Sequence, residues 1–148
     1  MRCSNQEAPG KFERAMATEF QQEDSQAPRS SQQTVLIVDD EQPILDLLQN
    51  ILQDAGYTVV TAHNGPSALT LARQLRPDLV LTDVMMPHMD GVALCTRLRR
   101  DPGMSHLAIV GMSAVRQAVA DVGFTAFLAK PFELDQVLRC VDEALSHV

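Results

Sequence analysis

Three short apolar runs in this chain each end in charged residues. The runs are residues 35–38, which lead into Asp39 and Asp40, residues 79–82, which lead into Asp83, and residues 127–129, which lead into Lys130. Short runs rich in branched aliphatic side chains predict buried strands. If these strands are neighbours in one parallel sheet, three carboxylates and one ammonium meet at its carboxyl edge, where open α/β sheets bind their ligands.

Such a concentration of negative charge needs a cation. Two carboxylates about 4 Å apart repel each other by roughly 4 kcal/mol at an effective dielectric near 20. Hard oxygen ligands select a hard cation, and Mg²⁺ commonly binds one or two carboxylates while keeping several waters and a phosphate oxygen. We therefore expect the adjacent pair Asp39 and Asp40 to hold Mg²⁺, and Asp83, alone at the end of a central strand, to be the nucleophile.

Two further residues fit phosphoryl transfer at this edge. A lysine opposite a metal-bound carboxylate can hold the transferred phosphoryl group, and Pro131 favours an extended backbone that aims the side chain of Lys130. Ser113 is expected at the end of the fourth strand. Its hydroxyl can hydrogen-bond a phosphoryl oxygen once one arrives.

From residue 34 onward, short apolar runs alternate with helical patterns. This alternation predicts an α/β fold with a parallel sheet and helices on both faces, and five such units fit the chain. The expected strands are residues 35–38, 57–61, 79–82, 108–112 and 125–129. The expected helices run from Pro43 to Gly56, over residues 66–75, through Val92 to Leu98, over residues 114–122 and over residues 133–146.

Apolar spacing predicts which helix faces are buried. The first helix is expected to bury Ile44, Leu47, Leu48, Ile51 and Leu52, and the third to bury Val92, Leu94, Cys95 and Leu98. Cys95 and Cys140 fall within helical patterns, and Cys3 lies in a polar segment. We therefore expect buried or partly buried thiols rather than a disulfide or a metal site.

Composition limits the class of protein. The 148 residues suffice for one domain, expected over residues 34–148, whereas residues 1–33 are rich in Gln, Glu and Ser and predict a flexible tail. No stretch approaches the about 20 apolar residues of a membrane span, and no signal peptide is evident, so we expect a cytoplasmic protein without membrane insertion. The net charge of -7 argues against direct nucleic-acid binding.

The charged strand ends belong to a longer set of motifs. These are Val38-Asp39-Asp40-Glu41, Asp83 followed by Met86-Pro87, Asp90-Gly91, Ser113-Ala114 and Lys130-Pro131-Phe132. In this order they make residues 34–148 resemble the receiver domains of two-component response regulators. The resemblance implies a doubly wound, flavodoxin-like sheet with strand order 2-1-3-4-5.

The resemblance also implies a function. The phosphohistidine of a histidine kinase or phosphotransfer protein would donate its phosphoryl group to Asp83, with Mg²⁺ held by Asp40, Asp83 and the backbone carbonyl of Met85. Asp39 would act mainly through water. Ser113 would then swing toward the phosphoryl group and Phe127 would turn inward. Contacts with a downstream protein effector would change, because new charge biases an element that has two packings.

Other features of the chain qualify this resemblance. The segment between Ser113 and Lys130 is shorter than in most receivers, which predicts a clipped or irregular fourth helix. We expect a stand-alone receiver without a DNA-binding output domain, and no enzyme activity beyond self-catalysed phosphoryl transfer and slow autodephosphorylation. One alternative is an interaction module that keeps the fold but not the phosphate chemistry. The other is a Mg²⁺-dependent phosphohydrolase, although such enzymes usually place two carboxylates two residues apart on the first strand.

Overall fold

The computed structural model of the chain describes residues 32–114 and 123–146. The predicted tail, apart from its last two residues, lies outside the described residues. The predicted helix over residues 114–122 lies outside them too, apart from its first residue. The division of the chain into a tail and one domain stays a prediction.

Five parallel strands form one sheet in the order β2-β1-β3-β4-β5, which confirms the predicted fold class. The strands are β1 (Thr34–Val38), β2 (Thr58–Ala62), β3 (Leu79–Asp83), β4 (Ala108–Ser113) and β5 (Ala126–Ala129). The helices of the described residues are α1 (Gln42–Asp54), α2 (Gly65–Leu75), α3 (Gly91–Arg100) and α4 (Leu134–Ser146), with a 3-10 turn, η2, over Pro102–Met104.

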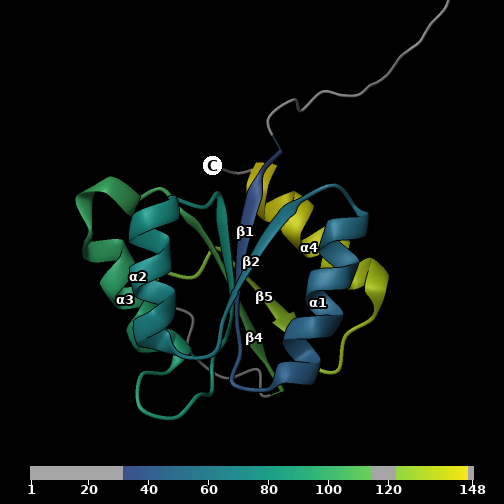
Figure 1. Cartoon of the computed structure of the whole chain (residues 1–148), viewed down its shortest axis with the longest axis horizontal. Coiled ribbons are helices and arrows are strands. Elements are labelled where there is room, and N and C mark those ends of the chain that lie inside the picture. The colour runs from purple at the N-terminus through teal and green to yellow at the C-terminus, as the bar shows by residue number, and fades with distance from the viewer. Residues whose placement is uncertain (1–31, 115–122, 147–148) are drawn as a thin grey trace, which may run out of the picture. The chain divides into compact units, whose positions relative to one another are not determined.

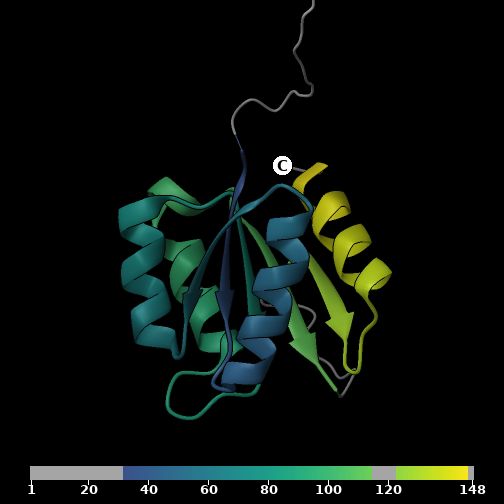
Figure 2. The ribbon, with the colours of Figure 1, turned by 45° about the vertical axis from the view of Figure 1, so that its right-hand side comes forward.

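The sheet is covered on both faces. Figures 1 and 2 show α1 and α4 on one side of the sheet and α2 and α3 on the other. Successive side chains of a strand point to opposite faces. Accordingly, Val35 and Ile37 of β1 pack with α1 and α4, whereas Leu36 and Val38 pack with α2 and α3. Burial on both faces explains why the central strands are continuous apolar runs rather than alternating ones.

Helix α1 differs in one respect from the predicted apolar face. It buries Leu45, Leu48, Ile51 and Leu52. Ile44 is partly buried, whereas Leu47 is 48% exposed, so its predicted burial was wrong. The three fully buried leucines of α1 follow each other at spacings of three and four residues, the repeat of one helix face, and Leu47 lies off that face.

The other helical predictions agree with the structure more closely. Helix α3 buries Leu94, Cys95 and Leu98, while Val92 is only partly buried. Cys95 is buried and Cys140 partly buried, and neither is part of a disulfide, as expected. Burial raises the pKa of both thiols, and the nearby Glu143 raises that of Cys140 further. Within the described segments, no helix has the length and apolar character needed to cross a membrane.

Adjacent leucines of α1 provide a test of this packing. Leu48→Ala should lower the free energy of unfolding by about 2–5 kcal/mol, because the fully buried side chain leaves a cavity. Leu47→Ala, on the same helix, should change it by less than about 1 kcal/mol. Urea unfolding followed by circular dichroism measures both values. Equal losses for the two variants would contradict the orientation of α1.

Candidate functional site

The register of the strands positions the acidic residues. Val38 of β1 lies opposite Thr82 of β3, so Asp39 and Asp83 follow at the same edge of the sheet. The backbone N–H of Asp39 continues the ladder toward β2 by donating to the carbonyl of Ala62, at 3.2 Å. Parallel pairing thus carries the ends of two strands, 44 residues apart in the chain, to neighbouring positions.

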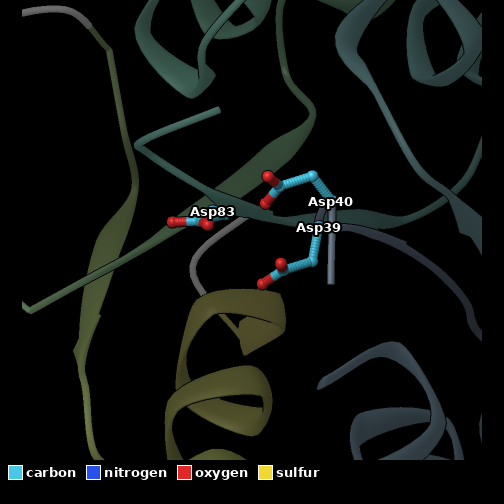
Figure 3. Close-up of side chains that lie close together, drawn as sticks. All are labelled: Asp39, Asp40 and Asp83. Carbon is cyan, nitrogen blue, oxygen red and sulfur yellow. The ribbon is translucent and has the colours of Figure 1, made fainter. Parts of the chain in front are cut away.

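Three carboxylates gather at this edge. Asp39, Asp40 and Asp83 each offer an oxygen, and these oxygens lie within 4.8 Å of one another (Figure 3). Asp39 and Asp83 are buried, whereas Asp40 is exposed. The structure therefore brings together the three acidic residues that the sequence places at strand ends.

Lys130 reaches the same edge from β5. Ser113 of β4 lies opposite Ala129 of β5, and the N–H of Lys130 donates to the Ser113 carbonyl at 3.0 Å. The Lys130 Nζ lies 3.3 Å from Asp39 Oδ2 and 3.4 Å from Asp83 Oδ2. One ammonium thus bridges the two buried carboxylates. The peptide bond that follows, Lys130–Pro131, is cis.

The electrostatics of Asp83 and Lys130 are coupled. Burial raises the pKa of Asp83, and the charge of Asp39 adds to this, while Lys130 and the N–H of Met85 oppose it. Burial alone would lower the pKa of Lys130, but the carboxylates of Asp39 and Asp83 outweigh it and raise the pKa. Lys130 therefore keeps its proton, and burial makes the ionised form of Asp83 unfavourable.

Within each of the two buried carboxylates, the two oxygens have different kinds of partner. Asp39 Oδ1 accepts from the N–H of Glu41 at 2.9 Å, and its Oδ2 faces Lys130. Asp83 Oδ1 accepts from the N–H of Met85 at 3.2 Å, and its Oδ2 also faces Lys130. Asp39 and Asp83 therefore each have one oxygen held by a backbone N–H and the other facing the same ammonium.

The loop after β3 is held close to Asp83 by a glycine. Gly91 opens α3, and its N–H donates to the carbonyl of Val84 at 2.9 Å. A Cβ at Gly91 would lie 2.4 Å from the backbone oxygen of Asp83 and 2.8 Å from the Cα of Val84. Only a residue without a side chain fits there. The sequence shows the Asp90-Gly91 motif but not this reason for it.

Ser113 lies on β4, the neighbour of β3, and Phe127 lies on β5, the next strand along the sheet. Ser113 is partly buried and follows Met112, the partner of Asp83 in the β3–β4 ladder. Phe127 is 43% exposed, and its ring centroid lies 5.0 Å from that of Phe124. Of the predicted switch pair, Ser113 thus lies close to Asp83 along the sheet edge, and Phe127 is in an exposed position.

The structure adds two residues to this region that sequence reasoning missed. A Cβ at Gly111 of β4 would lie 3.0 Å from the Phe124 ring, 3.1 Å from the Phe127 ring and 3.1 Å from Val84 Cγ2. Gly111 therefore leaves the space that the Phe124–Phe127 pair fills. An aromatic residue three positions before Phe127, together with a glycine inside a strand, was the available signal.

The donor set fits a hard divalent cation. Carboxylate oxygens are the ligands that Mg²⁺ prefers, and exposed Asp40 leaves one side of the cluster open to water and to a phosphate oxygen. Among the residues that the structure describes, no thiol or imidazole joins the cluster, so its donors favour a hard cation over a softer metal.

A parallel 2-1-3-4-5 sheet with an acidic cluster and a lysine at its carboxyl edge defines a class of phosphate-handling signalling domain. The family model "Response regulator receiver domain" matches residues 35–142. The chain therefore belongs to the response regulator receiver domain family of two-component signalling, and the recognition made from its motifs is confirmed. Phosphorylation and Mg²⁺ binding are typical of this family.

Curated relatives are full-length regulators. The "DNA-binding dual master transcriptional regulator RpaA" of Synechocystis is 38% identical over 112 residues, which cover 72% of this chain and 46% of RpaA. The probable transcriptional regulator ycf27 of Guillardia theta is 36% identical over 116 residues, covering 75% of this chain and 46% of the relative. The chain thus matches less than half of the length of these relatives.

The match to this chain covers almost the whole length of similar proteins whose structures are known. The chemotaxis response regulator CheY4 of Vibrio cholerae is 31% identical with a TM-score of 0.73, covering 77% of this chain and 99% of CheY4. A putative response regulator from Chloroflexus aurantiacus is 34% identical with a TM-score of 0.74, covering 78% of this chain and 99% of that protein.

Two glycines provide a matched test of the loop after β3. Gly91→Ala should cost roughly 1–3 kcal/mol of stability through overpacking, and it should also weaken Mg²⁺ binding because it displaces the backbone of Asp83. Gly56→Ala, at φ 100° with open space around it, should cost about 1–2 kcal/mol through its backbone alone and leave Mg²⁺ binding unchanged. Chemical unfolding and titration calorimetry measure the two effects. Equal Mg²⁺ affinities would count against the role given to Gly91.

The raised pKa of Asp83 predicts a pH-dependent effect on stability. In EDTA at pH 7, Asp83→Asn should raise the melting temperature, because an ionised carboxyl that burial disfavours is removed. The gain should shrink as the pH falls through the raised pKa of folded Asp83, and it should vanish below about 3, where the carboxyl is protonated in both folded and unfolded states. Asp54→Asn, an exposed carboxylate at the end of α1, is the control and should have little effect. A melting temperature of Asp83→Asn at or below that of the parent at pH 7 would refute this reading.

Proposed function

We propose that this receiver accepts a phosphoryl group on Asp83 in a Mg²⁺-dependent reaction and thereby switches its protein contacts. The observation that carries the proposal is the Lys130 ammonium, which lies within 3.4 Å of a carboxylate oxygen of both Asp39 and Asp83. A cation in that position can stabilise the negative charge of a phosphoryl group that is bound to Asp83.

Asp83 is the acceptor in this proposal. One of its carboxylate oxygens attacks the phosphorus of the donor, the bond from phosphorus to the donor nitrogen breaks, and an acyl phosphate forms. Asp83 is 7% exposed, so a donor can reach it from the open side of the cluster only. Lys130 then holds a phosphoryl oxygen, while Oδ1 of Asp83 stays oriented by the N–H of Met85.

Asp40, Asp83 and the backbone carbonyl of Met85 would hold the Mg²⁺ ion, and Asp39 would contribute through water. The ion supplies positive charge that offsets the carboxylates and the incoming phosphoryl oxygens. The placement of Asp40 supports its part, because its side chain is exposed beside two buried carboxylates.

The switch would run through Ser113 and Phe127. The Ser113 hydroxyl would donate to a phosphoryl oxygen, and Phe127 would move from its exposed position toward the sheet. A phosphoryl group adds about -1.5 to -2 charges and three strong acceptor oxygens, enough to bias an element that has two packings. The position of Ser113 beside the partner of Asp83 in the ladder supports this route.

Receiver domains are phosphorylated by histidine kinases, and we propose a histidine kinase or a phosphotransfer protein as the donor here. The downstream partner would be a protein effector in the cytoplasm. The net charge of -7 argues against direct contact of the chain with nucleic acid. Action without a DNA-binding output domain stays a prediction, since relatives such as RpaA extend well beyond the matched region.

Intact mass after mixing the protein with acetyl phosphate tests the acceptor. With Mg²⁺ the parent should gain the mass of one phosphoryl group, and it should gain none with EDTA. Asp83→Asn should gain none under either condition, while Asp54→Asn, remote from the site, should behave as the parent does. Lys130→Ala should slow the gain, because it removes the bridging cation.

Three outcomes would count against the proposal. A phosphoryl group on Asp83→Asn would show that another residue is the acceptor. No gain from acetyl phosphate or from phosphorylated kinases would favour an interaction module that does not use phosphate. Repeated release of phosphate from a phosphomonoester would favour a phosphohydrolase, because a receiver is phosphorylated once and turns over slowly.

A further inference from the structure

Positive charge is gathered on one side of the sheet. Helices α2 and α3 contain four arginines between them and no acidic residue, whereas α1 and α4 contain five acidic residues and one arginine. Figures 1 and 2 show α2 and α3 side by side on one side of the sheet and α1 and α4 on the other. A chain with a net charge of -7 therefore has a locally basic side.

Exposed arginines lie at the carboxyl ends of α2 and α3. We call them the arginine surface, and they are Arg73, Arg76, Arg97 and Arg100. The two helix ends are joined by polar contacts. Arg73 Nε lies 3.5 Å from Oδ2 of Asp101, the residue after α3. Arg76 Nη1 donates to the carbonyl of Gly103 at 3.3 Å. The four side chains therefore belong to one region of the surface.

The structural roles of arginine do not account for this surface. A helix dipole favours a basic residue near the carboxyl end of its helix, but neither α1 nor α4 has one in its last turn. Within the described residues, the side chains of Arg97 and Arg100 make no hydrogen bond or ion pair. These two guanidinium groups are available to a ligand.

Arg99, between them in the sequence, shows how a structural arginine of this helix is placed. It is partly buried, and its guanidinium group donates to three backbone carbonyls. These are the carbonyls of Ser105, Leu107 and Gly123. The contrast with Arg97 and Arg100 indicates that the exposed arginines have no comparable part in the fold.

The arginine surface repels itself. Arg97 and Arg100 are three residues apart on one helix, so their side chains lie on the same face. Asp101 offsets part of the charge through Arg73, but the Arg73 side chain remains 56% exposed. An incoming carboxylate would relieve the repulsion, because the planar guanidinium fork binds a carboxylate through two parallel N–H donors.

We propose that the arginine surface is a docking site for a short acidic segment of a partner protein. Complementary charge favours a ligand rich in carboxylates. A long polyanion, such as nucleic acid or an anionic bilayer, would extend beyond the four arginines and face the acidic side chains that dominate the rest of the chain. A segment of a few residues lies within the surface and avoids that repulsion.

The arginine surface lies away from Asp83. The carboxyl end of α2 leads through Pro77 and Asp78 into the first residue of β3, whereas Asp83 is the last residue of that strand. The surface and the acidic cluster are thus at opposite edges of the sheet. Docking therefore needs no phosphoryl group, goes beyond the proposed function and holds a partner at the receiver in either state.

Fluorescence anisotropy with a labelled hexaglutamate peptide tests the docking site. The parent should bind the peptide saturably, and binding should weaken between about 50 and 300 mM salt because exposed charges are screened. Arg97→Ala should weaken binding about fivefold, as expected for the loss of one exposed ion pair. Arg139→Ala, which removes an exposed arginine of α4, is the matched control and should bind as the parent does.

Both variants should keep the melting temperature of the parent, because both side chains are exposed, so misfolding would not explain a loss of binding. No saturable binding below about 1 mM peptide would overturn the docking site. Equal affinities of Arg97→Ala and Arg139→Ala would overturn it too.

Two further measurements test the ligand class and the separation from Asp83. A single-stranded DNA oligonucleotide or phosphatidylserine vesicles that bind more tightly than the peptide, and lose binding in Arg97→Ala, would overturn the assignment to an acidic protein segment. Asp83→Asn should bind the peptide with the affinity of the parent. Weaker binding by this variant would contradict a surface that acts independently of Asp83.

Discussion

The mutual repulsion of carboxylates at one edge of the sheet is the constraint on which the rest of the structure depends. Asp39 and Asp83 are buried with oxygens close to each other and to those of Asp40, an arrangement that a protein cannot hold without positive charge. Lys130 supplies part of that charge and remains protonated because of the same carboxylates. A cation bound at this edge would offset the remaining repulsion, so cation binding and folding would act on the same groups.

The sheet keeps this cluster together with little help from the loops. Asp39 and Asp83 follow paired residues of β1 and β3, and Lys130 follows paired residues of β4 and β5. β1, β3 and β4 are held by the apolar cores on both of their faces and β5 by the core under α1 and α4, so core packing fixes the positions of the charged groups at the strand ends. A shift of any strand by one residue would move a charged group away from the edge and expose apolar side chains at the same time.

Much of this arrangement can be predicted from the sequence, because the charged residues of the cluster come directly after the apolar runs that form the strands. Apolar runs that stop at Asp39, Asp83 and Lys130 are enough to predict the edge at which these residues meet. Helix faces were less certain: Leu45 and Leu47 are both apolar, and only the packing of α1 on the sheet decides which is buried. The space left by Gly111 was not predictable from the strand pattern, because its meaning depends on Phe124, which lies 13 residues further along the chain and on another segment.

Gly111 and Phe124 also bear on how this domain can change over evolutionary time. A side chain at residue 111 and the ring of Phe124 compete for one volume, which Val84 and Phe127 border as well. Either position can therefore gain bulk only when the other loses it, and homologues should show the two sizes varying inversely. Because Val84 adjoins Asp83 and Phe127 is 43% exposed, such a paired replacement would alter the packing between Asp83 and the surface while leaving every charged group in place.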